Sequence, residues 1–210
     1  MQETINKAKA LVKQQLGEDT SGHDYYHVVR VVKLSLEIAR KEGVADLDMV
    51  ELLAWLHDLA DVKLVDDAIA AKHTMDEWLK HELTPNDATL ISSCLSEIGF
   101  KGGQMNATHV FSKIVNDADK LDAMGAVGIA RCFAFGAYKQ QAMYAPTIKP
   151  QSFETEEAYR QLKSTSYNHI SEKLLKLKDY LYTTTAKELA KSRHDFLMQF
   201  VAQFEEEVGV

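Results

Sequence analysis

Residues 46–61 of this 210-residue chain read DLDMVELLAWLHDLAD. Apolar side chains recur along one line at three-residue intervals, close to the 3.6-residue period of an α-helix. The residues on this line are Val50, Leu53, Leu56 and Leu59. Asp46 precedes them as an N-cap, because its carboxylate can accept a hydrogen bond from a backbone N–H of the first turn. We therefore expect a helix from Asp46 to Leu59, with the polar pair His57 and Asp58 near its end.

The sequence on both sides of this segment predicts further helices. Apolar residues again follow helical spacing, and glycine, proline and capping residues mark the ends of each segment. The expected helices span residues 4–16, 24–43, 67–81, 84–99, 108–125, 125–138, 155–182 and 185–208. The chain shows no internal repeat and no linker, so we expect the helices to form one all-α body.

Local signals fix the starts of several of these helices. Asp24 is expected to cap the second helix, and Thr84 precedes a proline in the first-turn position of the fifth. Thr185 and Glu188 have the spacing of a capping box for the last helix. In that helix an aromatic residue recurs every four positions, which predicts core packing. These residues are Phe196, Phe200 and Phe204.

The composition argues against several classes of protein. Three prolines and ten glycines leave few turns for an all-β fold. The 24 Lys and Arg against 31 Asp and Glu give a formal net charge of −7, the opposite sign to a protein that binds nucleic acid through its phosphates. Cys94 and Cys132 have no CxxC partner, which favours a reducing cytoplasm. We expect no export signal, because the first 19 residues lack an apolar stretch, and no membrane span, because Arg131 interrupts the most apolar stretch, Ala123 to Tyr138.

Four residues carry metal-binding side chains near helix ends or inside apolar helices, where a polar group needs a partner. They are His27, His57, Asp58 and Asp119. Adjacent side chains diverge by about 100° on an ideal helix, yet His57 and Asp58 can converge on one ion because they differ in length. Two imidazoles and two carboxylates leave positions on a six-coordinate ion for water and a phosphate oxygen. An isolated His-Asp pair occurs by chance in many chains, so the prediction depends on the spacing of all four residues.

That spacing resembles the HD-domain superfamily of metal-dependent phosphohydrolases. His57-Asp58 follows His27 by about 30 residues, and Asp119 stands in the sequence DADKLDA. The flanking sequences look like the small bacterial branch of YpgQ type, over essentially the whole chain. The segments that carry this likeness are SGHDYYHVVRVV, AWLHDLADVK, IVNDADKLDAMGAVGIAR and NHISEKLLKLKD.

The resemblance implies an HD-domain orthogonal helical bundle that forms a single domain over residues 1–210. Its metal core would occupy about residues 20–140, and the C-terminal helices, residues 154–208, would pack on it. The cofactor would be one divalent ion held by His27, His57, Asp58 and Asp119. Manganese is the first expectation, with iron, nickel, cobalt, magnesium and zinc as alternatives. Ile170 and Ser171 stand where the family has aromatic residues, which leaves the shape of the nucleoside pocket open.

The activity implied by the resemblance is hydrolysis of (deoxy)nucleoside triphosphates to monophosphate and pyrophosphate, with water attacking the α-phosphorus. Two alternatives stay open. One is a nucleoside monophosphate phosphohydrolase of 5'-nucleotidase type, and the other is a nucleotide-binding regulatory module without turnover. The expected partner is a small nucleotide rather than nucleic acid or a membrane, and the chain would work in the cytoplasm as a monomer or homodimer.

Other residues are candidates for work beside the ion. Asp61 is three residues after Asp58 on the same helical face, so it could accept a proton from a bound water, or equally act as a cap or surface carboxylate. Lys63, Lys120 and Lys173 could neutralise phosphate charge, although most lysines in such a chain are solvated.

Asp122 lies three residues after Asp119 and shares its face, where it could bind a sugar hydroxyl or form a structural salt bridge. His23 is expected near the mouth of the site. Three further histidines fall between Asp58 and Asp119, where superfamily members with two metals place extra ligands. They are His73, His81 and His109. Their loose spacing favours ordinary helix-surface histidines, and a second metal stays the alternative.

Overall fold

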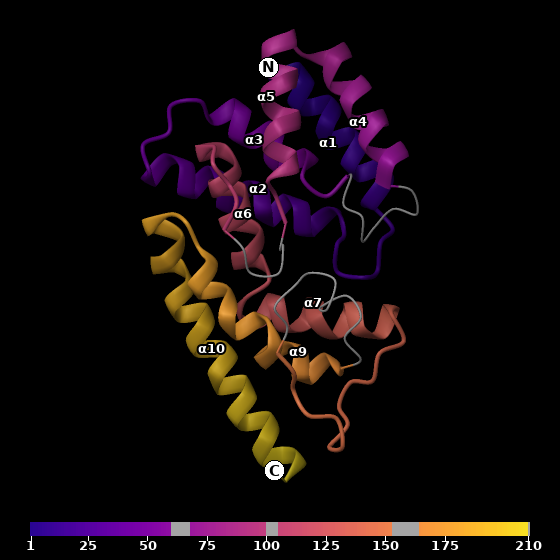
Figure 1. Ribbon diagram of the computed structural model, residues 1–210, viewed down its shortest axis with the longest axis vertical. Coiled ribbons are helices and arrows are strands. Elements are labelled where there is room, and N and C mark those ends of the chain that lie inside the picture. The colour runs from indigo at the N-terminus through magenta and orange to yellow at the C-terminus, as the bar shows by residue number, and fades with distance from the viewer. Residues whose placement is uncertain (60–67, 100–104, 153–163, 210) are drawn as a thin grey trace. The chain divides into compact units, whose positions relative to one another are not determined.

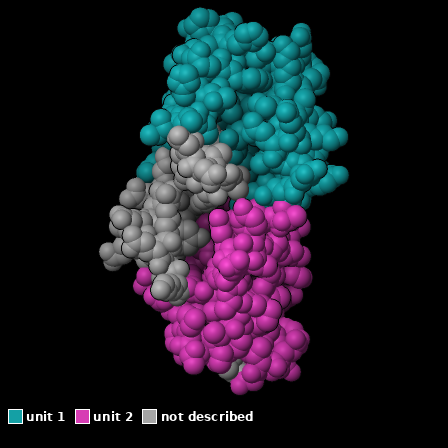
Figure 2. Space-filling view, turned by 90° about the vertical axis from the view of Figure 1, so that its right-hand side faces the viewer, with its two compact units in different colours: residues 1–19, 23–99, 106–118 teal, residues 20–22, 100–105, 119–210 magenta. Residues whose placement is uncertain are grey.

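Figure 1 shows a computed structural model of the chain, in which residues 1–59, 68–99, 105–152 and 164–209 are described. These residues form helices and loops, and no strand occurs among them. The expected all-α fold is therefore confirmed over this part of the chain. The chain divides into two compact units, coloured in Figure 2. Unit 1 comprises residues 1–19, 23–99 and 106–118, and unit 2 comprises residues 20–22, 100–105 and 119–210. The single-domain organisation expected from the sequence stays a prediction.

Unit 1 is built around one short central helix, α3. The described helices of the unit are α1 (Gln2–Leu16), α2 (Tyr25–Lys41), α3 (Leu47–Leu56), α4 (Ala68–Glu82), α5 (Pro85–Ser96) and most of α6 (Val110–Asp122). Within this unit α3 packs against α1, α2 and α5, and α4 packs against α5. The side chains of Leu52, Leu53 and Leu56 on α3 are completely buried. Seven of the ten residues of α3 are buried, and a helix with so much apolar surface packs inside a core, which explains the central position of α3.

Two of the predicted caps are present, and a third cap stands at the predicted start of the fifth helix. The Asp24 carboxylate accepts a hydrogen bond from the backbone N–H of His27 at 2.7 Å, and Asp46 accepts one from the N–H of Met49 at 3.1 Å. The Thr84 hydroxyl accepts one from the N–H of Asp87 at 3.3 Å. These caps were predictable because each is set by residues within one helical turn of one another.

The predicted end of α3 was wrong. The helix ends at Leu56 rather than Leu59, and residues 57–59 form a turn in which the N–H of Leu59 donates to the carbonyl of Leu56 at 3.2 Å. This three-residue hydrogen bond tightens the chain relative to an α-helix. His57 and Asp58 therefore stand in a turn directly after α3.

Unit 2 contains α7 (Gly125–Tyr138), α9 (Ser166–Glu172), the 3₁₀ helix η1 (Leu174–Tyr180) and the long α10 (Thr184–Val208) in its described part. Within the unit α7 packs against α9 and α10, and η1 packs against the same two helices. Figure 1 shows α10 in yellow, ending at the C-terminus. The predicted meeting of two helices near Gly125 is confirmed, since α6 ends at Asp122 and α7 begins at Gly125 with φ of 69°.

Three predictions for unit 2 were wrong. A single helix over 155–182 does not form, because Thr165 caps α9 and the backbone breaks at Lys173 before η1; residues 155–163 lie outside the described part. The cap of α10 is Thr183, whose hydroxyl accepts from the N–H of Ala186, and not Thr185. Phe196 is 44% exposed, so only part of the aromatic series packs in the unit. None of the described helices has both the length and the apolarity needed to cross a bilayer.

Candidate metal centre

The neighbouring helices α2 and α3 bring three of the four predicted ligands together in unit 1. The Asp24 cap fixes the first turn of α2, from which His27 projects, and the turn after α3 supplies His57 and Asp58. All three side chains are buried, and that of His27 is completely so. Burying two imidazoles and a carboxylate costs free energy unless each finds a partner, so this arrangement requires a specific reason.

The two imidazoles converge on the one carboxylate. His27 Nε2 lies 3.1 Å from Asp58 Oδ2, and His57 Nε2 lies 3.3 Å from Asp58 Oδ1. The rings of His27 and His57 meet edge to face, with centroids 5.4 Å apart. His57 and Asp58 are adjacent in the turn that follows Leu56, and their side chains lie beside each other and beside that of His27.

The charges of this cluster are strongly interdependent. Burial alone would raise the pKa of the Asp58 carboxyl, but the adjacent His57 and the nearby His27 lower it well below its ordinary value of 3.8. His23 contributes in the same direction, and its ring lies 5.8 Å from that of His27. Asp58 is therefore held as an anion inside the protein, and this is the state in which a carboxylate binds a metal.

The cluster fits a divalent ion. His57 Nδ1 lies 2.8 Å from the carbonyl oxygen of Ala54. Because a carbonyl oxygen can only accept a hydrogen bond, Nδ1 must carry a hydrogen and donate it to Ala54. In the neutral ring Nε2 then carries a lone pair, and it faces a carboxylate oxygen, which also has only lone pairs. His57 Nε2 and Asp58 Oδ2 are buried and make no hydrogen bond within the described residues. A cation shared by these atoms would satisfy both.

Asp119 lies on α6, whose earlier turns are anchored in unit 1. Asn116 donates to the carbonyl of Glu97 at 3.0 Å and accepts from the N–H of Gly99 at 3.1 Å, and the Ser112 hydroxyl donates to the carbonyl of Cys94 at 3.4 Å. Asp119 follows Asn116 by three residues, about one turn of the same helix, and is half-buried. It is the first residue of α6 that belongs to unit 2.

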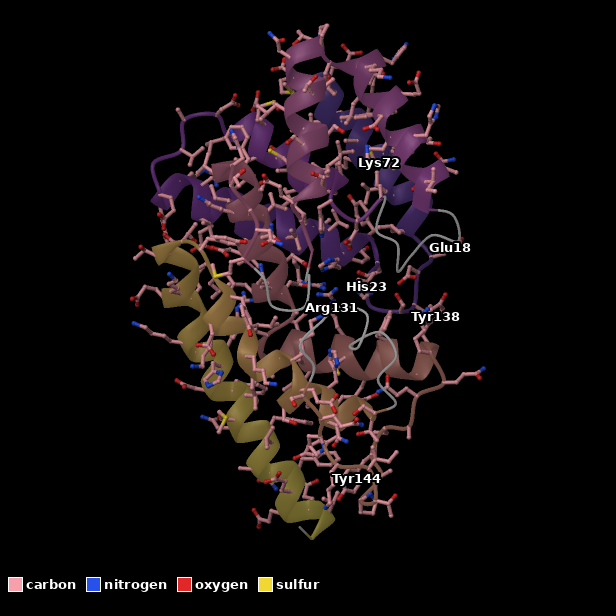
Figure 3. The ribbon with its side chains drawn as sticks, in the orientation of Figure 1. Glu18, His23, Lys72, Arg131, Tyr138 and Tyr144 are labelled. Atoms are coloured by element: carbon pink, nitrogen blue, oxygen red, sulfur yellow. The ribbon has the colours of Figure 1, made fainter. Side chains whose placement is uncertain are left out.

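Asp122 forms a salt bridge, which was one of the two predicted roles. Its Oδ2 atom lies 3.0 Å from Nη1 of Arg131 on α7, and both side chains are largely buried. Arg131, labelled in Figure 3, also donates from Nε to the carbonyl oxygen of Gly22 at 2.7 Å. The sequence interpretation missed this arginine as a functional candidate. The available signal was that Arg131 is the one charged residue in the apolar sequence of α7.

The predicted phosphate-binding residues are only partly described. Asp61 and Lys63 lie outside the described residues. Lys120 is buried in unit 2, and its ammonium group lies 5.3 Å from the centre of the Tyr182 ring, a cation–π contact. Lys173 is half-buried at the break between α9 and η1, and its charge acts on the thiol of Cys132. Both lysines are thus held against other side chains and are not fully solvated.

The remaining predicted histidines differ in their surroundings. His73 and His81 are exposed on α4, and His81 pairs with Glu82 at 3.0 Å. His109 stands at the start of α6, where its Nδ1 accepts from the N–H of Phe111 at 3.3 Å. His23 contacts His27, as expected for a residue near the site.

Comparison with known proteins decides the family. A family profile described as HD domain matches residues 24–124. The protein YpgQ of Bacillus subtilis (strain 168) is 37% identical over 201 residues, which cover 94% of this chain and 90% of YpgQ. The chain belongs to the HD-domain superfamily. As a member it is a metal-dependent phosphohydrolase, and the matched range contains all four predicted metal ligands.

Solved structures of similar proteins match nearly the whole chain. The crystal structure of a Lactobacillus plantarum protein has 33% identity and a TM-score of 0.90, covering 100% of this chain and 98% of its own. YpgQ in complex with ADP has 33% identity and a TM-score of 0.76, covering 97% of each chain. An HD-superfamily hydrolase from Bacillus thuringiensis has 36% identity and a TM-score of 0.74, covering 100% of this chain and 98% of its own. The HD-domain fold predicted from the sequence is therefore confirmed.

Proposed function

We propose that this HD-domain protein hydrolyses (deoxy)nucleoside triphosphates to monophosphates and pyrophosphate, with one divalent ion held by His27, His57, Asp58 and Asp119. The observation that carries the proposal is the buried cluster of α2 and α3, in which two imidazoles face one carboxylate and the atoms His57 Nε2 and Asp58 Oδ2 make no hydrogen bond within the described residues. Manganese is the first metal to test, and the cytoplasm is the proposed location.

Asp119 is the proposed further carboxylate ligand. Asp119 stands in the segment DADKLDA that carries the family likeness, and the HD-domain profile covers it. The hydrogen bonds of Asn116 and Ser112 support this assignment, because they fix the part of α6 that directly precedes Asp119.

His57, Asp58 and Asp61 each have a proposed role beside the metal ion. A divalent ion in such a site supplies Lewis acidity, which lowers the pKa of a coordinated water and polarises a phosphate oxygen. His57 is held by Ala54 in the tautomer that presents Nε2, and Asp58 stays ionised beside it. Asp61 is proposed as the base that accepts a proton from the attacking water, a role that rests on its place three residues after Asp58 in the sequence.

The substrate class rests on two supports. The relative YpgQ was solved in complex with ADP, so a nucleotide is the proposed partner of this chain as well. A triphosphate also needs several positive groups, and we assign Lys63, Lys120 and Lys173 to this task, with Asp122 acting elsewhere as part of a salt bridge.

A nucleotide panel tests the reaction. The protein is incubated with manganese and nucleoside mono-, di- and triphosphates in ¹⁸O-labelled water, and phosphate is separated from pyrophosphate. We expect pyrophosphate from triphosphates, with the label in the nucleoside monophosphate. Label found only in inorganic phosphate would show attack at a terminal phosphorus and would replace the proposal by the monophosphate phosphohydrolase alternative.

A lysine variant tests the contact to the triphosphate. Lys173→Ala is expected to lower triphosphate turnover far more than any monophosphate turnover, because the longer substrate carries more charge. Lys187→Ala, an exposed lysine of α10, is the matched control and should leave both rates unchanged. Equal losses for the two substrates would remove Lys173 from the phosphate site.

A further inference from the structure

We propose that Asp122 and Arg131 form a positioning pair that fixes the chain entering α2, and through it the imidazole of His27. The inference rests on the proposed metal site, and it replaces a sugar-binding role for Asp122. It concerns how the protein positions the side chain of His27 and not which atoms bind the metal.

The pair and its contact with the backbone are direct observations within unit 2. The Arg131 guanidinium donates from Nη1 to Asp122 at 3.0 Å and from Nε to the Gly22 carbonyl at 2.7 Å. One planar group thus holds a side chain of α6 and the backbone of a loop 109 residues earlier in the chain. The flat guanidinium suits this arrangement because its donors diverge at fixed angles.

Stability alone does not explain the pair. The side chains of Arg131 and Asp122 are 12% and 3% exposed, so both charges are largely removed from water. A buried salt bridge of this kind often adds nothing to stability, since desolvation offsets the attraction, and apolar residues can replace it. The feature that apolar residues could not reproduce is the hydrogen bond to Gly22.

Gly22 is shaped for this contact. Its φ is 89°, a region that side-chain-bearing residues rarely adopt, and a Cβ atom there would lie 3.3 Å from both Cα and Cβ of Arg131. The backbone therefore turns tightly against α7 at this point. The next residues are His23, which contacts His27, and Asp24, which caps α2 by accepting from the His27 N–H.

The other end of the pair lies beside a second proposed ligand. Asp122 follows Asp119 by one turn of α6. Arg131 thus connects the turn of α6 after Asp119 to the residues that lead into His27. Loosening the guanidinium would free the start of α2 to shift, and a metal site is sensitive to such shifts because the groups that orient its ligands typically matter 10- to 100-fold for affinity.

The test measures manganese affinity of the purified full chain by equilibrium dialysis with elemental analysis. Arg131→Lys keeps the charge but cannot reach both partners with the geometry of a guanidinium, and Asp122→Asn removes the ionic partner. Gly22→Ala disturbs the same contact from the other side. Each variant is expected to weaken manganese binding by about 10- to 100-fold. The double variant Gly22→Ala/Arg131→Lys should be no weaker than the more affected single variant, because both changes break one contact.

A second readout needs no metal. In the metal-free protein, backbone amides at the start of α2, residues 23–28, should exchange hydrogen faster in the three variants than in the wild type. Tyr167→Phe serves as the structural control, since it removes a 3.0 Å hydrogen bond to Glu205 in the same unit without touching Arg131. It should leave both the metal affinity and these amides unchanged. Arg40→Lys, on an exposed arginine, controls for the substitution itself.

The outcomes separate this inference from the proposed function. If the wild type binds manganese and folded Arg131→Lys, Asp122→Asn and Gly22→Ala all bind it within threefold of the wild type, the positioning role is wrong and the metal site stands. If Arg131→Lys does not fold, the other two variants decide. If the wild type does not bind manganese, both the metal site and the pair's role are overturned.

Discussion

Asp58 and Asp122 are both buried carboxylates near a helix end, one in unit 1 and one in unit 2, but their partners differ in kind. Asp58 faces the Nε2 atoms of two imidazoles, which are neutral unless they take up a proton. Asp122 faces Arg131, whose charge is permanent and whose other donor holds a backbone carbonyl.

The difference separates two uses of a buried charge. The permanent positive charge of an arginine neutralises the carboxylate without a metal ion, so such a pair can position other groups but does not need a cation. Imidazoles balance a carboxylate only by binding a proton or by sharing a cation with it, so such a cluster is open to a metal. The type of partner, more than burial itself, therefore distinguishes the candidate metal site from the positioning pair.

The largest effect is expected from Asp58→Ala. The change removes the carboxylate that faces both imidazoles, so manganese binding should fall by at least about 100-fold and hydrolysis should fall with it. Elemental analysis of the purified protein checks this. His73→Ala, on the exposed face of α4, is the control and should retain full occupancy. If Asp122→Asn lost more metal than Asp58→Ala, the assignment of metal binding to Asp58 and of positioning to Asp122 would be wrong.

The second largest effect is expected from Asp61→Asn, which should impair proton transfer and leave metal binding intact. Asp61→Asn keeps the size of the side chain and removes its charge, so manganese should stay bound while the hydrolytic rate falls by roughly 10²- to 10⁴-fold, the range for a lost acid–base group. Steady-state rates measured beside metal content distinguish this variant from Asp58→Ala. A rate equal to that of the wild type would reduce Asp61 to a surface or capping carboxylate.

Packing in unit 2 should be independent of the metal. In Gly136→Ala the new Cβ would clash with the Ser166 hydroxyl oxygen, so the packing of α7 on α9 must adjust. We expect a loss of about 1 to 2 kcal/mol in the free energy of unfolding, since overpacking exceeds the gain in helix propensity. Urea denaturation should give the same loss with and without manganese. Adding Ser166→Ala should recover it, and failure to do so would show that another contact is responsible.

The smallest effect is expected at a third carboxylate, Glu97, which accepts hydrogen bonds from uncharged donors. Its oxygens accept from the Thr108 hydroxyl at 2.5 Å and from the N–H groups of Thr108 and His109, which join α5 to the start of α6. Burial raises the pKa of Glu97, but these hydrogen bonds outweigh it and lower the pKa from 4.5 to about 2. Because the folded-state pKa is lowered, the stabilisation is present above about pH 4.5 and disappears as the pH falls towards about 2.

Glu97→Gln should therefore cost about 1 kcal/mol at neutral pH, the usual effect of a lost helix cap. The difference between wild type and variant in urea denaturation should shrink steadily from pH 5 to pH 2. A constant difference over that range would mean that the charge of Glu97 contributes nothing.

Local features of the fold and the candidate site were predictable from the sequence. Asp24, Asp46 and Thr84 cap helices through bonds that span three residues, so the pattern alone determines them. The start of α10 was harder, because three threonines run from 183 to 185 and any of them could be the cap. The break at Lys173 lies in a sequence without glycine or proline, so no local signal marks it.

Features that depend on distant residues could not be predicted. Phe196 continues a helical series, yet the face of a helix that is buried depends on which elements pack against it, and this residue lies outside that contact. The contact of Arg131 with Gly22 joins residues 109 positions apart. The four proposed metal ligands could be picked out despite their separation, but only because their combined spacing resembles a known family.

The surroundings of Trp55 give the protein an internal optical reporter. Its indole stacks on Tyr25 with ring centres 6.0 Å apart, and the Lys9 ammonium lies 5.8 Å from its centroid. Trp55 and Tyr25 stand two residues before His57 and His27, respectively. The chain has one other tryptophan, Trp78, so a Trp78→Phe protein would emit from this position alone. Its fluorescence should change as manganese is added and stay constant in Asp58→Ala, which would make loading of the site visible in real time without any added dye.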